Sequence, residues 1–455
     1  MIKQISLLLI VTSLVLHSQA QDTTKTIPSK VPASEPFAFG DFGWQNGNNR
    51  QKSALLDSKY FTGSVTFDVN YTQSNHQPID NTVVGSTALS RNGEIQVSFV
   101  GIGGDFHYNN VRGRFMTQFG TRSTVVPRND VSQYHGQYNL ADAYKYISEA
   151  YGGYHWDKWH GINLDAGIFM SYIGLMSYNN FENWSYQPSY TSDNTPWFFN
   201  GVRLQMFPTE KLKIEAWFIN GWQSYAKFNK MPGMGFSVKY APKEYMSFIT
   251  NDYVGSDAAG LPKRTRFHSD NSFQLRYYNN PKAKGATKAA FSITGDIGFE
   301  NGGGVTPFGS KDGTAPAQNF ISGMVYHRIW FGDKFAWNVG GGYMHNPGRY
   351  LVLSPTGEAS SVPPYGSNPF TANIGDKFDA WDASTTFDFM PNDYITWKVE
   401  FVHREANVPY FAGPGGVTSP SGYTAALTGS SNPPTWTPDL VKSESRFILA
   451  MVVRF

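Results

Sequence analysis

The feature that most constrains this chain is a strict alternation of apolar and polar residues over unusually long stretches. Residues 61–72 show it best, because every second position is apolar or glycine and the positions between them are Thr, Ser, Asp or Asn. Successive side chains of a β-strand point to opposite faces, so this pattern predicts a strand with one apolar and one polar face. Strands of soluble sheets usually have about 5 to 6 residues. The longer segments here favour strands that cross a membrane.

The same alternation recurs along the whole chain and predicts about sixteen strands. The expected segments are 61–72, 94–106, 110–119, 145–157, 162–174, 198–207, 211–223, 233–241, 245–254, 271–278, 288–300, 319–330, 335–344, 378–390, 394–405 and 445–455. Charged residues recur on the polar phase, as with Asp68, Asp165 and Lys398. One face of each strand therefore suits hydrocarbon and the other suits water.

The connections between these segments alternate between short and long. The short ones include 158–161, 208–210, 242–244, 331–334 and 391–393, and the long ones include 73–93, 120–144, 175–197, 345–377 and 407–444. Transmembrane barrels have short periplasmic turns, long extracellular loops and an even number of strands, whereas a soluble sandwich buries its apolar faces in one core. The predicted fold is an all-β, antiparallel, up-and-down transmembrane β-barrel of about sixteen strands.

The N-terminus has the features of an export signal. Lys3 precedes the apolar run 5–16 and the small-residue site 18–20, so we expect residues 1–20 to be a cleaved signal peptide. The run is too short for a membrane-spanning helix, which needs about 20 residues. We expect 21–58 to form a periplasmic N-terminal tail, too short for a plug domain but able to enter the barrel in part, and 59–455 to form a barrel in the bacterial outer membrane.

The last predicted strand ends on an aromatic residue. Its apolar face consists of Phe447, Leu449, Met451, Val453 and Phe455. Such an ending looks like the signal for outer-membrane assembly, although an ordinary buried last strand is the alternative. Aromatic residues also fall near other strand ends, where barrels carry girdles at the lipid interface; they are Trp156, Trp159, Trp184, Trp197, Trp222, Trp330, Trp381 and Tyr394. The expected partners are outer-membrane lipid and the assembly machinery.

Composition and motifs argue against several functions. The chain has no cysteine, so disulfides and thiolate metal sites are excluded. A net charge of +2 implies no basic surface for nucleic acid. Metalloprotease, nucleophile-elbow and phosphate-loop motifs are absent from the sequence. The turn segment 155–160 contains His155, Asp157 and His160, for which metal binding and a solvated turn are the alternatives. We expect neither an enzyme nor a cofactor.

The third long loop, 175–197, is the main candidate for a functional feature. If it folds into the lumen, its acidic residues would face basic residues of the wall, and the resulting transverse field would orient polar solutes. The predicted pore-constriction residues are Arg112, Arg114, Glu182, Asp193, Arg203, Lys213 and Glu215. The alternative is a loop that caps the barrel outside, with Arg112, Arg114 and Arg203 paired to acids in the wall.

Several short motifs resemble a known family. They are 37–44 (FAFGDFGW), 161–167 (GINLDAG), 183–186 (NWSY), 199–203 (FNGVR), 220–222 (NGW) and 404–411 (REANVPYF). Together they resemble the OmpL-like β-barrel porins (porin-2) of bacterial outer membranes. The resemblance implies a barrel and a pore activity, without a known substrate and without catalytic residues.

The function predicted from these observations is a porin, a passive water-filled channel for small hydrophilic solutes. The alternative is a barrel that serves as a scaffold for ligand-binding or adhesive loops such as 407–444, which is rich in Gly, Pro, Ser and Thr. The identity of the solute, gating and the oligomeric state, for which a homotrimer is one candidate, are left open by the sequence.

Overall fold

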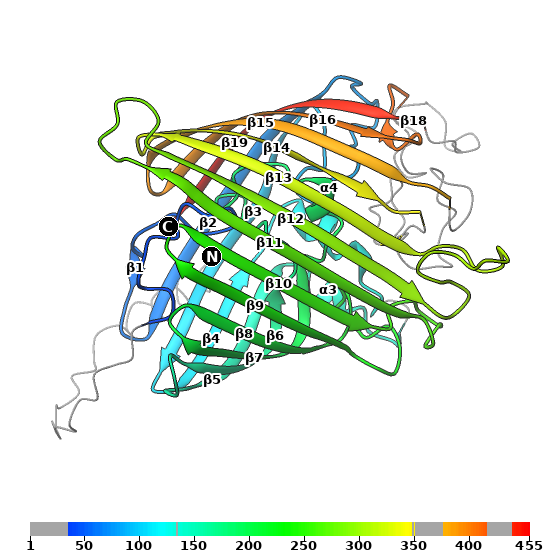
Figure 1. The fold of residues 1–455 in the computed structure, drawn as a ribbon, viewed down its shortest axis with the longest axis horizontal. Helices are drawn as coiled ribbons and strands as arrows, with labels where there is room; N and C mark the ends of the chain where they lie inside the picture. Colours follow the sequence, from blue (N-terminus) through cyan, green and yellow to red (C-terminus); the bar gives the residue numbers. More distant parts are fainter. Residues whose placement is uncertain (1–34, 133–134, 348–349, 351–375, 416–438) are drawn as a thin grey trace, which may run out of the picture. The chain divides into compact units, whose positions relative to one another are not determined.

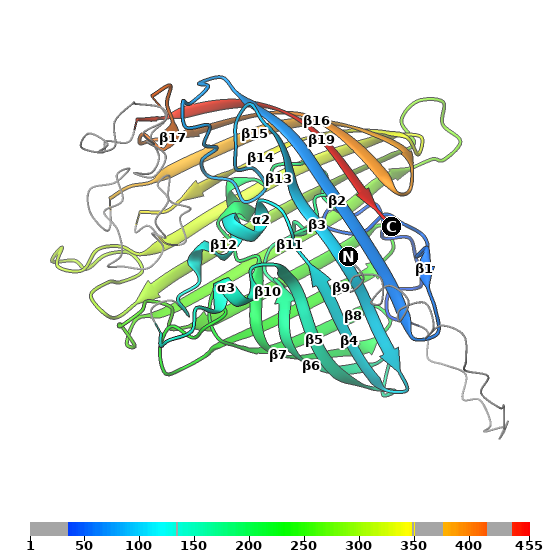
Figure 2. The same ribbon diagram turned by 180° about the vertical axis from the view of Figure 1, so that it is seen from behind.

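The computed structural model describes residues 35–455 except 133–134, 348–349, 351–375 and 416–438. These residues form a closed antiparallel barrel (Figures 1 and 2). The expected signal peptide, 1–20, and the first part of the expected tail lie outside the described residues. None of the described helices is long and apolar enough to cross a membrane.

Sixteen long strands make up the wall. They are β2 (Phe61–Ser74), β3 (Ile95–Tyr108), β4 (Val111–Thr117), β5 (Ile147–Trp156), β6 (Ile162–Met170), β7 (Phe198–Thr209), β8 (Leu212–Ile219), β9 (Gly233–Lys243), β10 (Met246–Gly255), β11 (Thr265–Asn279), β12 (Lys288–Asn301), β13 (Asn319–Phe331), β14 (Phe335–His345), β15 (Asp379–Asn392), β16 (Ile395–Ala406) and β19 (Ser443–Arg454). Each strand pairs with its neighbour in sequence, and β19 pairs with β2 to close the barrel.

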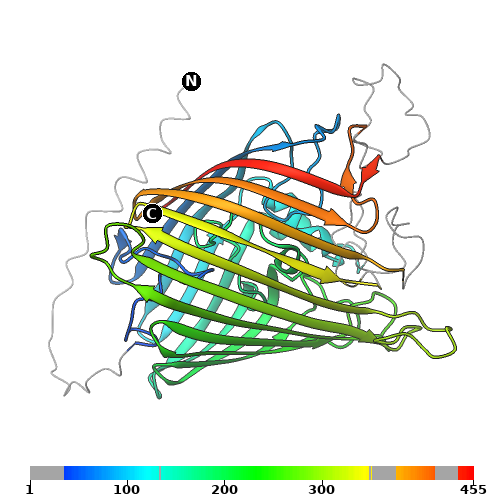
Figure 3. The same ribbon diagram turned by 45° about the horizontal axis from the view of Figure 1, so that its top comes forward.

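Short elements lie at the ends of the wall and within it. They are β1 (Leu56–Asp57), which pairs with β2, the small pair β17 (Phe411–Ala412) and β18 (Leu440–Val441), the helices α2 (Arg122–Val125), α3 (Leu140–Tyr144) and α4 (Tyr190–Asp193), and the 3-10 helix η1 (Val126–Asn129). Figure 3 shows the long connection 302–318, between β12 and β13, at the end of the barrel opposite to the C-terminus. We call the end with the long connections extracellular, because short turns face the periplasm in such barrels.

The two faces of each strand confirm the predicted alternation. In β15, Asp382, Thr386 and Asp388 are buried in the interior, whereas Trp381 and Phe387 on the opposite phase are exposed. A charged side chain on the lipid face of such a barrel costs about 2–4 kcal/mol at the bilayer midplane. The polar phase therefore faces the lumen and the apolar phase faces the lipid.

All sixteen predicted strands are present, with differences at some ends. β11 begins at Thr265, six residues before the predicted start, because Arg266, His268 and Asp270 face the lumen rather than belonging to a loop. β6 ends at Met170 and β8 at Ile219, four residues before the predicted ends. In both cases the chain leaves the wall earlier than alternation alone indicates.

The aromatic residues near strand ends form two groups rather than one girdle. Trp156, Trp159 and Trp381 are exposed on the outer surface, as expected for residues at a lipid interface. In contrast, Trp184, Trp197, Trp222 and Trp330 are buried inside the barrel. The girdle interpretation was wrong for this second group, because their positions in loops or on the inward phase direct them into the lumen.

A large aromatic cluster lies within the extracellular half of the barrel. It combines wall residues with residues from long connections, and its members include Phe169, Tyr190, Phe199, Trp217, Trp222, Tyr253, Phe320, Tyr350, Phe378, Tyr410 and Phe411. Because the connections between strands supply several of these rings, they fold toward the barrel axis. The lumen at this end is therefore narrower than the strand number alone would indicate.

Candidate functional site

The connection between β6 and β7, residues 171–197 and called loop L3 below, lies inside the barrel. Every residue from Asn183 to Phe199 is buried, and α4 within the loop packs against β13, β14 and β15 (Figure 1). These strands lie on the far side of the lumen from β6, since β15 is seven steps from it around a ring of sixteen. Loop L3 therefore crosses the lumen instead of capping the barrel outside.

Three charged residues of β15 and β16 hold the far end of loop L3. The Glu400 carboxylate accepts hydrogen bonds from the backbone N–H groups of Tyr186 (2.6 Å) and Gln187 (2.9 Å). The Asp382 carboxylate accepts from the Ser189 hydroxyl and the Tyr190 N–H, both at 2.8 Å. Arg404 forms an ion pair of 2.8 Å with Asp193, and both side chains are fully buried. Hydrogen bonds to ionised groups are about twice as strong as neutral ones, so this attachment is firm.

The near half of loop L3 is attached to β2 and to the α2 segment. The Asp68 carboxylate of β2 accepts hydrogen bonds from the Tyr186 hydroxyl (2.7 Å) and the Asn180 side-chain amide (2.9 Å). Arg122 donates to the side-chain oxygen of Asn180 at 2.7 Å and to the backbone carbonyl of Tyr178. The loop is thus held along its length by groups from widely separated parts of the chain.

The N-terminal segment, residues 35–55, also enters the barrel. The Trp184 backbone N–H donates to the Asn46 side chain at 2.9 Å, and the Trp184 indole N–H donates to the Trp44 carbonyl at 3.0 Å. The Asn46 N–H in turn donates to Gln274 of β11 at 2.9 Å. Part of the expected periplasmic tail therefore lies between loop L3 and the wall.

Gly47 shows how closely this segment approaches loop L3. Its φ of +81° suits glycine, and a Cβ atom placed there would lie 2.2 Å from the Leu175 carbonyl oxygen. The Gly47 N–H donates to the Glu182 carbonyl at 3.1 Å. Only a residue without a side chain allows this contact.

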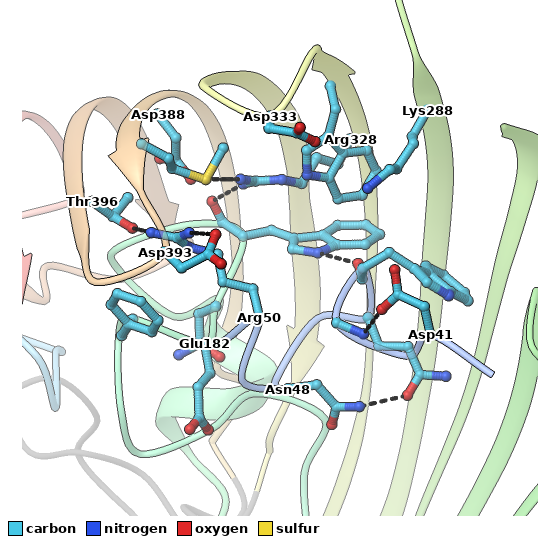
Figure 4. A pocket seen from close by; sticks show the side chains of 18 of the residues that line it. Asp41, Asn48, Arg50, Glu182, Lys288, Arg328, Asp333, Asp388, Asp393 and Thr396 are labelled. Carbon is cyan, nitrogen blue, oxygen red and sulfur yellow. Dashed lines mark hydrogen bonds and ion pairs between the residues drawn. The ribbon is translucent and has the colours of Figure 1, made fainter. Parts of the chain in front are cut away.

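Two polar cavities are lined by both the N-terminal segment and loop L3. The turn-side cavity (Figure 4) measures about 310 Å³ and includes residues of the β13–β14 and β15–β16 turns, among them Asp333 and Asp393. The inner cavity measures about 230 Å³ and lies among loop L3, β8, β9, β10 and β11. Asn48 lines both cavities. The segment and loop L3 together therefore bound the space that a solute could occupy.

The turn-side cavity carries charges of both signs. Arg328 and Lys398 contact the Asp388 carboxylate at 2.7 Å and 3.0 Å. Arg50 of the N-terminal segment lies 3.6 Å from Asp393 and donates to the Thr396 hydroxyl at 3.1 Å, as Figure 4 shows. Burial lowers the pKa of the Arg50 guanidinium to about 10, with Asp393 opposing the shift. The paired charges give this cavity no strong preference for ions of one sign.

The structure pairs the predicted constriction residues differently from the expectation. Arg112 and Arg203 both contact Asp165, at 3.4 Å and 2.7 Å, and Arg114 contacts Asp105 (2.7 Å) and Glu149 (2.6 Å). Glu182 pairs instead with Arg454, and Asp193 pairs with Arg404. The three arginines pair with acids of nearby strands, whereas the loop acids meet Arg404 of β16 and Arg454 of β19, because loop L3 reaches across the lumen to β15 and β16.

The remaining predicted residues, Lys213 and Glu215, form an ion pair of 3.0 Å on β8. Lys213 also lines the inner cavity. Arg114 lines a further cavity of about 320 Å³, which Arg454, the partner of Glu182, also lines. A role of these residues at a constriction stays a prediction.

The residues that hold loop L3 were not assigned that role from the sequence. Arg404, Asp382 and Glu400 all stand on the inward phase of their predicted strands, so alternation marks them as lumen residues. Nothing local marks them as partners of a loop that lies about two hundred positions earlier in the chain. Trp44 is also buried, and apart from its apolar side chain nothing in the sequence predicts this burial.

Metal chemistry finds no support in the described part of the chain. Among these residues no group of three or more His, Asp or Glu side chains is arranged to hold a metal ion. Near the end of β5, His155 bonds to Asn163 (2.7 Å) and Asp157 (3.1 Å). These contacts use both ring nitrogens.

The closed barrel, its polar lumen and the inward loop define an outer-membrane β-barrel porin, a channel protein for small solutes. The chain belongs to the family described as "Putative beta-barrel porin-2, OmpL-like", whose model matches residues 43–455. A search of curated proteins finds no match.

Several solved outer-membrane proteins match the chain at low sequence identity. OprB of Pseudomonas putida matches with a TM-score of 0.50 and 9% identity, covering 87% of this chain and 94% of its own. The outer membrane channel DcaP of Acinetobacter baumannii (TM-score 0.47, 11% identity) covers 90% of this chain and 100% of its own. OmpT of Vibrio cholerae (TM-score 0.47, 9% identity) covers 89% and 100%. At such identities the likeness to OprB concerns the fold alone.

Proposed function

We propose that this porin is a narrow diffusion channel that sorts small hydrophilic solutes by size and polarity and carries out no chemistry on them. The observation that carries the proposal is that loop L3 and the N-terminal segment both lie in the lumen, where they leave two polar cavities of about 310 and 230 Å³. A barrel without these segments would leave one wide aqueous pore.

The proposed constriction has two kinds of boundary. On one side, Glu182 and Asp193 of loop L3 pair with Arg454 of β19 and Arg404 of β16. On the other side, strands β4, β6 and β7 carry the Arg112–Asp165–Arg203 network. Fixed charges at close quarters select solutes by field and pore diameter together. The aromatic cluster at the extracellular end adds a second narrow region, so we expect a small conductance.

Single-channel recording in planar bilayers tests the proposal. The refolded mature protein is expected to give stable, ohmic steps, and permeation of sugars and amino acids of graded size should show a cut-off. A gel-shift assay for heat-modifiable mobility would first confirm that the barrel is folded. A folded barrel that never conducts would contradict the proposal and favour the scaffold for binding or adhesive loops.

The expected homotrimer and recognition of the C-terminal strand by the assembly machinery stay predictions. Phe455 is positioned for the latter, since its side chain is 41% exposed while its backbone pairs with Val65. Native mass spectrometry of the detergent-extracted protein would measure the assembly state directly.

A further inference from the structure

The inner cavity is lined by two lysines, of which only Lys213 has an acidic partner among the described residues. Lys213 of β8 and Lys239 of β9 stand directly opposite each other in the strand register. Like charges placed in this way destabilise a sheet. Lys213 is compensated by Glu215 at 3.0 Å, and Glu215 also accepts from Gln205 at 2.7 Å.

Lys239 has only neutral partners among the residues that the structure describes. Its ammonium group lies 3.2 Å from the Gln45 side-chain oxygen and 5.4 Å from the centre of the Phe37 ring. Both partners belong to the N-terminal segment, which closes this side of the cavity. The charge of Lys239 is thus available to a solute in the inner cavity.

Two buried hydrogen-bond donors point to the same kind of ligand. The Asn46 side-chain amide nitrogen and the Trp197 indole nitrogen have no hydrogen-bond partner in the described structure, and both residues are at least nine-tenths buried and line the cavity. Buried donors without partners are rare in folded proteins, because leaving them unsatisfied costs about 1–3 kcal/mol each. No unpartnered buried side-chain acceptor belongs to a described residue that lines this cavity.

Two amide oxygens of the cavity wall already accept hydrogen bonds. The Gln274 oxygen accepts from Asn46 (2.9 Å), and the Asn251 oxygen accepts from the Ser237 hydroxyl (2.8 Å). The Asn251 amide donates to Asp270 at 2.8 Å, which compensates part of that carboxylate. What the cavity offers a solute is therefore mainly N–H donors and cationic groups.

The rest of the lining suits a carbon skeleton. Tyr172, Tyr178 and Trp197 contribute aromatic rings to the wall of the cavity. The Tyr172 and Tyr178 hydroxyls already donate to the Asp252 carbonyl (2.9 Å) and to Gln118 (2.6 Å). Ring faces can then pack against the carbon atoms of a solute whose charged end meets Lys239.

We propose that the inner cavity is a binding site for small organic anions with a carboxylate group on a short hydroxylated carbon chain. Lys239 and Lys213 bind the carboxylate, and the Asn46 and Trp197 N–H groups donate hydrogen bonds to it or to neighbouring oxygens. The site rests on the proposed channel function and makes it selective, since a neutral solute of equal size gains no charge-assisted contact there.

The test compares gluconate with glucose, a neutral solute of similar size. In planar bilayers, gluconate at millimolar concentration is expected to interrupt the potassium chloride current of the porin, whereas glucose leaves it nearly unchanged. The Lys239→Gln variant should weaken the block by about tenfold, as expected for one lost charge-assisted hydrogen bond. Trp197→Phe keeps an aromatic ring but removes the N–H donor, and it should weaken the gluconate block by a smaller factor.

The control is Lys284→Gln, in the exposed turn between β11 and β12, which should leave the block unchanged. Equal block by glucose and gluconate, or a block that Lys239→Gln does not weaken, would overturn the binding site while conduction stands. Tryptophan fluorescence of the folded protein in detergent measures gluconate binding without conduction. Binding that depends on Lys239 in a protein that forms no channels would support the site and overturn the channel function instead.

Discussion

Two parts of the lumen wall show the same alternation of apolar and polar residues but make different contacts inside the barrel. The anchoring wall, made of β15, β16, β19 and β2, directs its charges at loop L3, and each carboxylate among Asp68, Asp382 and Glu400 accepts at least two hydrogen bonds from the loop. The cavity wall, made of β8, β9, β10 and β11, contacts the N-terminal segment and leaves a space of about 230 Å³. The comparison teaches that polar residues on the inward phase either hold a loop or border a cavity.

The difference has an energetic origin. A buried ion pair must recover the cost of removing both charges from water, and it does so only when further hydrogen bonds satisfy the remaining atoms. Arg404 meets this condition on the anchoring wall, because it also donates to the backbone carbonyls of Gly85 and Pro188. Lys239 on the cavity wall has no such set of contacts. Loss of the Arg404 side chain should therefore lower the stability of the protein, whereas loss of the Lys239 charge should change the selectivity of the channel.

Arg404→Ala should have the largest effect on this comparison. It leaves the fully buried Asp193 carboxylate without its ion-pair partner, and breaking such a pair destabilises proteins by about 3–5 kcal/mol. Equilibrium unfolding in denaturant would measure the loss, and single-channel recording should show a noisier current from a looser loop L3. Arg404→Lys keeps the charge but not the planar guanidinium, so its free energy of unfolding should lie between those of the unchanged protein and Arg404→Ala. A loss below about 1 kcal/mol, the range of exposed pairs, would contradict the anchoring role.

Glu400→Gln should have the next largest effect. The substitution turns two charge-assisted hydrogen bonds from Tyr186 and Gln187 into at most one neutral contact, and bonds to charged groups contribute about 1.5–3 kcal/mol. We expect a loss of about 2 kcal/mol in the free energy of unfolding. Glu405→Gln on the same strand is a suitable control, because Glu405 is exposed on the opposite phase. Equal stability of the two variants would refute the assignment.

Gly47→Ala tests whether the N-terminal segment bounds the two cavities. The added Cβ would lie 2.2 Å from the Leu175 carbonyl oxygen, so the segment should move away from loop L3 at a cost of about 1–3 kcal/mol. The single-channel conductance should rise because the space between the cavities widens. Gly93→Ala is a matched control, since Gly93 also has a positive φ (+72°) but has no atom within 4 Å of its Cβ position. An unchanged conductance in Gly47→Ala alongside normal folding would remove the segment from the proposed constriction.

Lys239→Gln should have the smallest effect on stability. The lysine forms no ion pair in the described structure and faces Lys213 across the strands, so its loss should change the free energy of unfolding by less than about 0.5 kcal/mol. The reversal potential in a salt gradient should shift toward cations, because one lumen cation is removed. Loss of stability as large as that of Arg404→Ala would mean that the two walls do not differ in the proposed way.

The sequence by itself determined the wall of this porin. A strand places successive side chains on opposite faces, so the period of two predicts each segment, its lipid-facing phase and, with the alternating loop lengths, the barrel. Even Arg404 and Glu400 could be placed in the lumen on this basis, because phase is a local property. The strand ends at Met170 and Ile219 were less predictable, since alternation continues where the chain has already left the wall.

Only the tertiary structure decided what fills the lumen. The path of loop L3 depends on hydrogen bonds such as that from Tyr186 to Glu400, which joins residues 214 positions apart. The place of Trp44 to Asn48 depends on contacts with Trp184 and Gln274, which join residues 140 and 228 positions apart. No local period encodes such contacts, because many acids and amides compete for each donor and the closed barrel selects among them. The wall was therefore predictable, whereas the contacts that fix loop L3 and the inner cavity were not.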